Sequence, residues 1–276
     1  MPLDPSEEPV IAPDPTAFNQ RTPQVPGRHA EPWSYRDLLL FLAFAIIALI
    51  VSNFVALTIY AALRPMTGWP VPAGLITSNT FFLLAAQLLF YAILFCYIYF
   101  LVVFRYHLRF WRGLRWTRLN HRSLARYIVL GILVTAAIQM VPTLLPDKID
   151  FPLRRLFSSP ASAYAIAAFA VLIAPFMEEI IFRGVLFAVF ESRIGLRSAV
   201  VITAVLFAGL HVPEYWGAWE HVVLIFLVGL IFSLARGLTG SVTPGFVLHV
   251  TYNACLMIGL FVVSSHFRII QSGLLR

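Results

Sequence analysis

Long apolar runs separated by short polar stretches dominate the chain from residue 38 onwards. A helix needs about 20 apolar residues to cross the hydrocarbon layer of a bilayer, and most of these runs approach or exceed that length. The pattern predicts an all-α protein, a polytopic transmembrane bundle of seven or eight helices. The runs cover residues 38–63, 81–104, 127–145, 161–190, 198–212, 222–235 and 242–264.

Composition excludes a soluble fold. Hydrophobic residues make up 60% of the chain, charged residues only 12%, and the mean hydropathy is +0.83. Soluble domains carry roughly 45–50% apolar and about 25% charged residues. Residues 1–36 differ from the rest, with eight prolines and mixed charge. Because such a segment buries little apolar surface, we predict a disordered tail at 1–36 and a transmembrane domain at 37–276.

The net charge of +7 is concentrated in loops beside the apolar runs. Basic residues are enriched in cytoplasmic loops of membrane proteins, so we predict that the loop after the second run and the N-terminal tail are cytoplasmic. This explanation of the charge leaves no reason to expect a nucleic-acid partner, whereas membrane lipids are expected partners. The loop contains seven arginines and no acid: Arg105, Arg109, Arg112, Arg115, Arg118, Arg122 and Arg126.

Three ionisable residues lie well inside the long fourth run, where charge is costly and by default indicates function. Glu179 and Arg183 are spaced i,i+4, so they can form an ion pair on one face of a helix. Glu178 points about 100° away, and we expect its partner on another helix. Pro175 removes a helical hydrogen bond and should loosen the turn before these carboxylates.

Two histidines occur in later apolar runs: His211, and His249 with Asn253 one turn further on. Polar groups in hydrocarbon need polar partners, and a single wet site shared with Glu178 would provide them. At 1.5 Å per residue, His249 lies about 10 Å and His211 about 20 Å from the inner ends of their runs. The two imidazoles therefore meet only if their helices are tilted.

A carboxylate with two imidazoles can activate water as a general base, with or without a metal ion. An asparagine amide can donate a hydrogen bond to a developing oxyanion. The zinc-protease pattern H-E-x-x-H is absent, yet Glu178, His211 and His249 could ligate Zn²⁺. Serine or cysteine nucleophiles have no supporting motif, so activated water is the preferred hypothesis.

Three motifs in this order resemble those of the CPBP intramembrane proteases, also called the CAAX protease and bacteriocin-processing, or Abi, family. The resemblance covers a motif core at 161–258, whereas the first three runs agree only in hydrophobicity. The motifs are Glu178-Glu179-x-x-x-Arg183, Phe207-x-x-x-His211 and His249-x-x-x-Asn253.

The resemblance implies a membrane-embedded endopeptidase with Glu178 as the general base. It also implies that His211 assists this glutamate, and that His249 and Asn253 complete the site and stabilise the oxyanion. The supporting residues would be Phe207 and the pair Glu179 and Arg183, which would position the motif helix.

The family resemblance further implies a hydrophobic, membrane-tethered or lipidated peptide substrate, with CAAX-like peptides as one option. Family members have been described both as metalloproteases and as metal-free glutamic proteases, and we favour a site that requires no cofactor. A plasma or inner membrane location is expected. The alternatives are a non-catalytic immunity or scaffold protein that binds a peptide in the same cavity, and a proton-coupled transporter. The absence of a clear internal repeat argues against the transporter.

Overall fold

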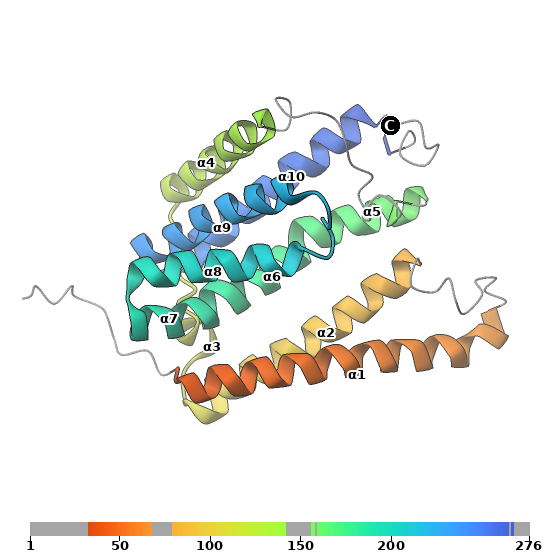
Figure 1. Ribbon diagram of the computed structural model, residues 1–276, viewed down its shortest axis with the longest axis horizontal. Helices are drawn as coiled ribbons and strands as arrows, with labels where there is room; N and C mark the ends of the chain where they lie inside the picture. Colours follow the sequence, from red (N-terminus) through yellow and green to blue (C-terminus); the bar gives the residue numbers. More distant parts are fainter. Residues whose placement is uncertain (1–32, 68–78, 142–155, 158, 265, 268–276) are drawn as a thin grey trace, which may run out of the picture. The chain divides into compact units, whose positions relative to one another are not determined.

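The computed structural model describes residues 33–67, 79–141, 156–157, 159–264 and 266–267. Within these ranges the chain forms helices and no strand, which confirms the all-α prediction (Figure 1). The predicted tail at 1–36 lies outside the described residues except for its last four positions. Of these four, Tyr35 and Arg36 already belong to the first helix.

The helices before the motif core follow the apolar runs closely. They are α1 (Tyr35–Thr67), α2 (Thr80–Phe100) with its wide-turned π-helical extension η3 (Leu101–Arg105), the short α3 (Phe110–Gly113) and α4 (His121–Met140).

The fourth run forms one composite helix that changes its winding four times. Its parts are α5 (Pro160–Ala168), η6 (Phe169–Ile173), α6 (Ala174–Glu179), η7 (Ile180–Leu186) and α7 (Phe187–Ile194), where η6 and η7 are π-helical. The remaining helices are α8 (Leu196–His211), α9 (Trp219–Thr239) and α10 (Thr243–Val263).

Six helical stretches in the described part of the chain are long and apolar enough to cross a membrane. They correspond to every predicted run except the fifth, which forms α8. This helix is apolar but has only 16 residues, about 24 Å of axis. Many large apolar side chains are exposed on the outside of the long helices. Since water would disfavour such a surface, the protein is an integral membrane protein.

Small residues allow the helices of the motif core to approach closely, as is typical of membrane bundles. Helix α9 packs against α8 where Gly229 faces Phe207, and a Cβ at 229 would lie 3.1 Å from the Phe207 ring. Gly131 of α4 lies against Thr251 of α10 in the same way, with 2.8 Å to the Thr251 Cβ. Helices α8 and α10 pack against the composite helix, α9 packs against both of them, and α4 packs against α10.

A buried carboxylate ties the first helix to the basic loop. Asp37, 2% exposed, accepts hydrogen bonds from the backbone and side chain of Ser34 and from the Tyr106 hydroxyl, and pairs with Arg105 at 2.9 Å. Burial, followed by the hydrogen bond to Asp37, raises the pKa of Tyr106 to about 12, so this hydroxyl remains a donor at physiological pH.

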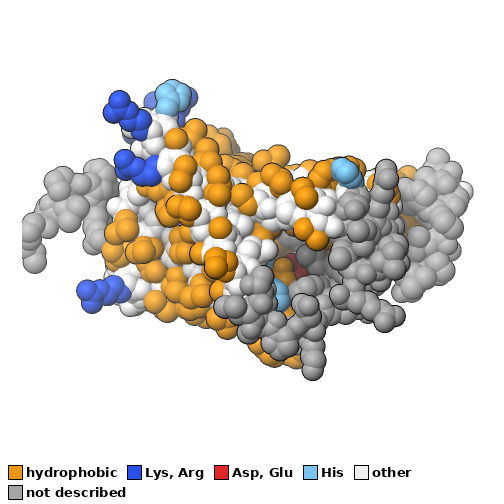
Figure 2. Space-filling view, turned by 90° about the horizontal axis from the view of Figure 1, so that it is seen from above, with side chains coloured by type: hydrophobic (Ala, Val, Ile, Leu, Met, Phe, Trp, Pro, Cys, Tyr) orange, Lys and Arg blue, Asp and Glu red, His pale blue; other side chains and the backbone are white. Residues whose placement is uncertain are grey.

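The basic loop lies beside the α9–α10 turn at one end of the bundle, and the end of α7 lies beside the start of α1. The carbonyl of Arg115 in the basic loop accepts from the Val242 amide in the α9–α10 turn, and Thr117 bonds to Ser241 at 2.7 Å. Arg193, at the end of α7, lies over the ring of Tyr35 in α1. Arginine side chains likewise gather at one end of the face in Figure 2. The grouping agrees with the predicted topology, whereas the cytoplasmic assignment of this end stays a prediction.

Candidate active site

Two wide turns flank the paired glutamates and interrupt the hydrogen-bond ladder of the composite helix. At the end of η6, the Ala174 amide donates to the carbonyl of Phe169, five residues back. The next residue is Pro175, which has no N–H to offer. The carbonyl of Ala170 therefore has no donor in its own helix. The loosened turn predicted from Pro175 is confirmed.

Side chains from other helices occupy the carbonyls that these wide turns leave open. The amide of Asn253 in α10 donates to the Ala170 carbonyl at 2.7 Å. At the end of η7, the Phe187 amide donates to the carbonyl of Phe182, five residues back. Because the winding then becomes α-helical again, the carbonyl of Arg183 is left without a backbone donor in its own helix. The Nε–H of Arg236 in α9 donates to this carbonyl at 3.2 Å. Helices α9 and α10 thus stabilise the irregular backbone on both sides of the glutamates.

Glu179 is the fully buried member of the glutamate pair. It is 0% exposed and forms the predicted i,i+4 ion pair with Arg183, at 3.0 Å between Oε1 and Nη1. The same Oε1 lies 3.1 Å from Nδ1 of His249. Gly245 of α10 makes room for this carboxylate, because a Cβ there would lie 2.7 Å from Glu179 Oε2. Burial and two charged or polar partners hold Glu179 in one position.

Arg183 is enclosed as completely as its partner. Its guanidinium lies 4.6 Å from the ring centre of Phe207 and 5.4 Å from that of Phe232, and Nη2 donates to the Gly229 carbonyl at 3.0 Å. Aromatic faces attract a cation most strongly when water is excluded. This surrounding explains how a charged arginine is tolerated within an apolar helix.

Glu178 has a different environment, although it is the next residue. Its side chain is 16% exposed, and Oε2 lies 3.7 Å from Nε2 of His249. The hydroxyl of Tyr91 in α2 donates to Oε1 at 3.3 Å. The predicted partners on other helices are present. A carboxylate that keeps contact with solvent beside an imidazole has the geometry that a general base requires.

His211 approaches the site through Phe207. Its Nδ1 lies 2.9 Å from the Phe207 carbonyl, and the Phe207 ring centre lies 4.9 Å from His211 and 5.6 Å from His249. The two imidazoles therefore lie on the same phenyl ring despite the difference in depth expected from residue counting. His211 forms no hydrogen bond or ion pair with Glu178 in this arrangement.

The loop after α8 adds a carboxylate that sequence patterns did not single out. Glu214 keeps solvent contact, yet protein surrounds it closely enough that desolvation raises its pKa. The charge of His211 opposes this rise, and the charge of Glu178 adds to it. Figure 2 shows acidic and histidine side chains at the bottom of a hollow in a largely hydrophobic face.

Tyr91 and Arg236 are the other residues that pattern analysis missed. A tyrosine in an apolar run has no distinctive local signal, and its contact with Glu178 joins positions far apart in sequence. Arg236 lies near the end of an apolar run, where a basic residue is ordinarily explained by loop topology. It is 1% exposed and lies over the Phe187 ring.

The metal-ligand hypothesis involved Glu178, His211 and His249. Among the residues that the structure describes, no group of three or more His, Cys, Asp or Glu side chains is arranged to hold a metal ion. Glu178 and His249 are neighbours, but His211 directs Nδ1 to a backbone carbonyl. Metal ligation by these three residues therefore stays a prediction.

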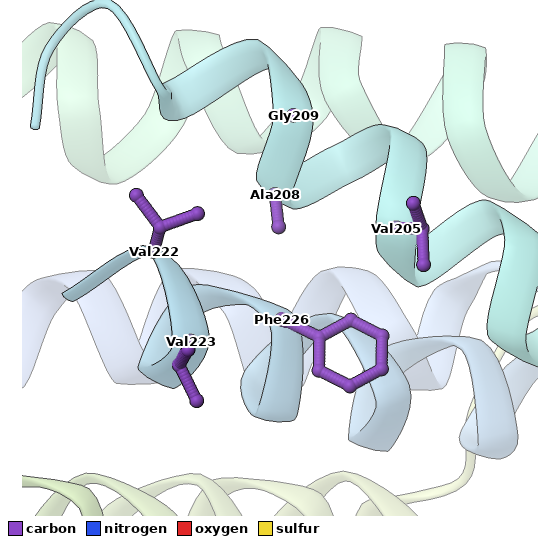
Figure 3. A pocket seen from close by; sticks show the side chains of 6 residues that line it. All are labelled: Val205, Ala208, Gly209, Val222, Val223 and Phe226. Carbon is purple, nitrogen blue, oxygen red and sulfur yellow. The ribbon is translucent and has the colours of Figure 1, made fainter. Parts of the chain in front are cut away.

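A shallow apolar groove of about 360 Å³ lies between α8 and α9, on another face of these helices (Figure 3). None of the candidate catalytic or supporting residues lines this groove, so it is separate from the candidate site. The groove is lined by Val205, Ala208, Gly209, Val222, Val223 and Phe226.

The site contains two adjacent carboxylates, one ion-paired and one accessible, and both lie close to imidazoles inside an apolar helical bundle. This arrangement defines a membrane protein with a candidate hydrolytic site. Residues 160–255 match the family model described as type II CAAX prenyl endopeptidase Rce1-like. This match confirms the resemblance to the CPBP/CAAX protease family, and the matched stretch contains all three motifs. Helices α1, α2 and α4 lie outside it. No curated protein and no solved structure gives a significant match.

Proposed function

We propose that the protein is an intramembrane endopeptidase that uses Glu178 to activate water. The observation that carries this proposal is the contrast between the two glutamates: Glu179 is buried against Arg183, whereas Glu178 is accessible beside His249. Neighbouring acidic groups held in different environments commonly have different roles in catalysis. Here one carboxylate supports the helix and the other remains available for chemistry.

In the proposed reaction, the Glu178 carboxylate accepts a proton from water while the water oxygen bonds to the carbonyl carbon of the substrate. The C–N bond then breaks, and the proton held by Glu178 passes to the leaving nitrogen. Glu179 lies at Nδ1 of His249 and so favours the tautomer with hydrogen on that nitrogen, which leaves Nε2 facing Glu178. The imidazole can then share the proton that Glu178 takes up.

The other motif residues take roles that their positions support. An amide nitrogen carries two hydrogens, so Asn253 can bond to Ala170 and still donate to an oxyanion. His211, whose ring centre lies 4.9 Å from that of Phe207, would assist through this shared contact with His249. We propose a hydrophobic or lipidated, membrane-tethered peptide as substrate, a plasma or inner membrane location with a cytoplasmic N-terminus, and no required metal.

The test uses purified protein in lipid vesicles with a C-terminally prenylated peptide and, in parallel, a hydrophobic transmembrane peptide. In H₂¹⁸O, hydrolysis should place one ¹⁸O atom in the new C-terminal carboxylate, as read by mass spectrometry. The metal-free mechanism also predicts an unchanged rate after treatment with a chelator. Loss of activity that added Zn²⁺ restores would assign a metal to the site. Intact peptides in both series would favour a non-catalytic binding protein.

A further inference from the structure

The first turns of α4 carry two exposed arginines, Arg122 and Arg126. Residues 101–140, from η3 to the end of α4, contain no aspartate or glutamate. Within the described part of the chain, neither of the two side chains forms an ion pair or a hydrogen bond. Arg105 differs from them, because it pairs with Asp37. The two α4 arginines therefore remain available to an anionic partner from outside the chain.

Arg122 and Arg126 begin an exposed stripe along one face of α4. At about 100° of rotation per residue, positions 122, 126, 129, 133 and 140 fall within roughly 60° of one another. After the two arginines this stripe is apolar, and its side chains are well exposed: Val129 at 55%, Leu133 at 60% and Met140 at 68%. One helix face thus combines two cations near its beginning with apolar side chains along the remaining turns.

Packing on α10 fixes the direction in which this stripe faces. Gly131 lies about 180° around the helix from Arg122, and a Cβ at 131 would lie 2.8 Å from the Thr251 Cβ of α10. Thr135 and Ile138, which share this side of α4, are 5% and 8% exposed. The stripe therefore faces away from the bundle, toward the surrounding bilayer.

The stripe has the chemistry of a phospholipid site. A guanidinium binds a phosphate through paired N–H···O bonds, and lipid acyl chains pack against apolar side chains. From Arg126 the stripe continues for about 21 Å to Met140, which exceeds the roughly 15 Å of hydrocarbon in one leaflet. We propose that Arg122 and Arg126 bind the phosphate of an anionic phospholipid. Its acyl chains then lie along Val129 and Leu133. Two arginines without a neighbouring acid favour a lipid with net negative charge over a zwitterionic one.

Basic residues near a helix end also act as topology signals, since they direct loops to the cytoplasm during insertion. A topology signal requires charge in the loop but no continuation along the helix. Arg126 lies more than one turn inside α4, on the same face as the exposed Val129 and Leu133. An acidic protein partner would likewise leave the apolar part of the stripe unused. The family match assigns no lipid site here, because α4 lies outside residues 160–255.

The experiment counts lipids bound to the purified protein by native mass spectrometry, during titration with dioleoyl phosphatidylglycerol or dioleoyl phosphatidylcholine. The wild type should bind the anionic phosphatidylglycerol about thirtyfold more tightly, since each basic residue near an anionic lipid contributes roughly a factor of five. Arg122→Gln/Arg126→Gln should bind both lipids with similar affinity. This variant keeps the other five arginines of the basic loop, so its membrane topology should be preserved.

The matched control is Arg193→Gln/Arg197→Gln, which removes two exposed arginines from α7 and α8 and should keep the lipid preference of the wild type. Glycerophosphoglycerol has the same headgroup without acyl chains. It should not displace bound phosphatidylglycerol, because it cannot occupy the apolar part of the stripe. Equal affinity of the wild type for the two lipids, an equal loss of preference in both double variants, or displacement by the headgroup alone would overturn the proposal. These measurements require no peptide hydrolysis, so their result is independent of the proposed function.

Discussion

Arg183→Met is expected to lower the free energy of unfolding by roughly 3–5 kcal/mol, the usual cost of leaving one partner of a buried ion pair alone. Both Arg183 and Glu179 are 0% exposed, so water cannot take over the role of the guanidinium. Methionine keeps most of the side-chain volume against Phe207 and Phe232. The loss of stability would therefore arise from the unpaired Glu179 carboxylate and not from a cavity at position 183.

Reversible unfolding in mixed micelles provides this measurement, with Arg197→Met as the matched control because Arg197 is exposed on α8. The control should change stability by less than about 0.5 kcal/mol. The double variant Glu179→Gln/Arg183→Met removes both charges and should recover most of the loss. If the single and double variants were equally unstable, the ion pair would not be the source of the effect.

Glu178→Gln is expected to lower the hydrolysis rate by about a thousandfold, within the range that general bases contribute. Glutamine keeps the shape of the side chain and can still accept the Tyr91 hydrogen bond, but it cannot take a proton from water. Unfolding stability should remain close to that of the wild type. Vesicle assays with the peptides described above measure the rate.

The adjacent glutamate provides the informative comparison. Glu179→Gln leaves Arg183 with a neutral partner at 0% exposure, so activity and stability should fall together. Glu220→Gln, in the first turn of α9, is the control for an acidic residue outside the site. Equal rate losses with equal destabilisation in Glu178→Gln and Glu179→Gln would contradict the division of roles between them.

Features that depend on local spacing along the chain were predicted correctly from the sequence. The i,i+4 relation of Glu179 and Arg183 is a property of one helix, and the structure confirms it at 3.0 Å. Apolar runs of membrane-spanning length located most helices within about four residues, because hydrocarbon thickness restricts their length. The exception is α4, which begins at His121, before the predicted start at residue 127. Pro175 indicated the irregular turn, since the missing N–H is visible in the sequence itself.

Contacts between helices were harder to predict, because no short-range pattern encodes them. Tyr91 reaches Glu178 across 87 positions, and only the packing of α2 against the composite helix brings the two together. No proline in η7 indicates its π-helical winding. The carbonyl of Arg183 that accepts a hydrogen bond from Arg236 could therefore not be predicted from the sequence. The expected oxyanion role of Asn253 stays a prediction, now beside an observed hydrogen bond to the backbone.

We propose that Glu178 makes this protein a membrane protease. The most direct measurement expresses the wild type and Glu178→Gln at equal levels in the same null background and compares the termini of membrane-associated peptides by mass spectrometry. We predict a set of new termini with the wild type that is lost with Glu178→Gln, and these termini would also identify the substrate. The same termini in both strains, with both proteins folded, would contradict catalysis at Glu178.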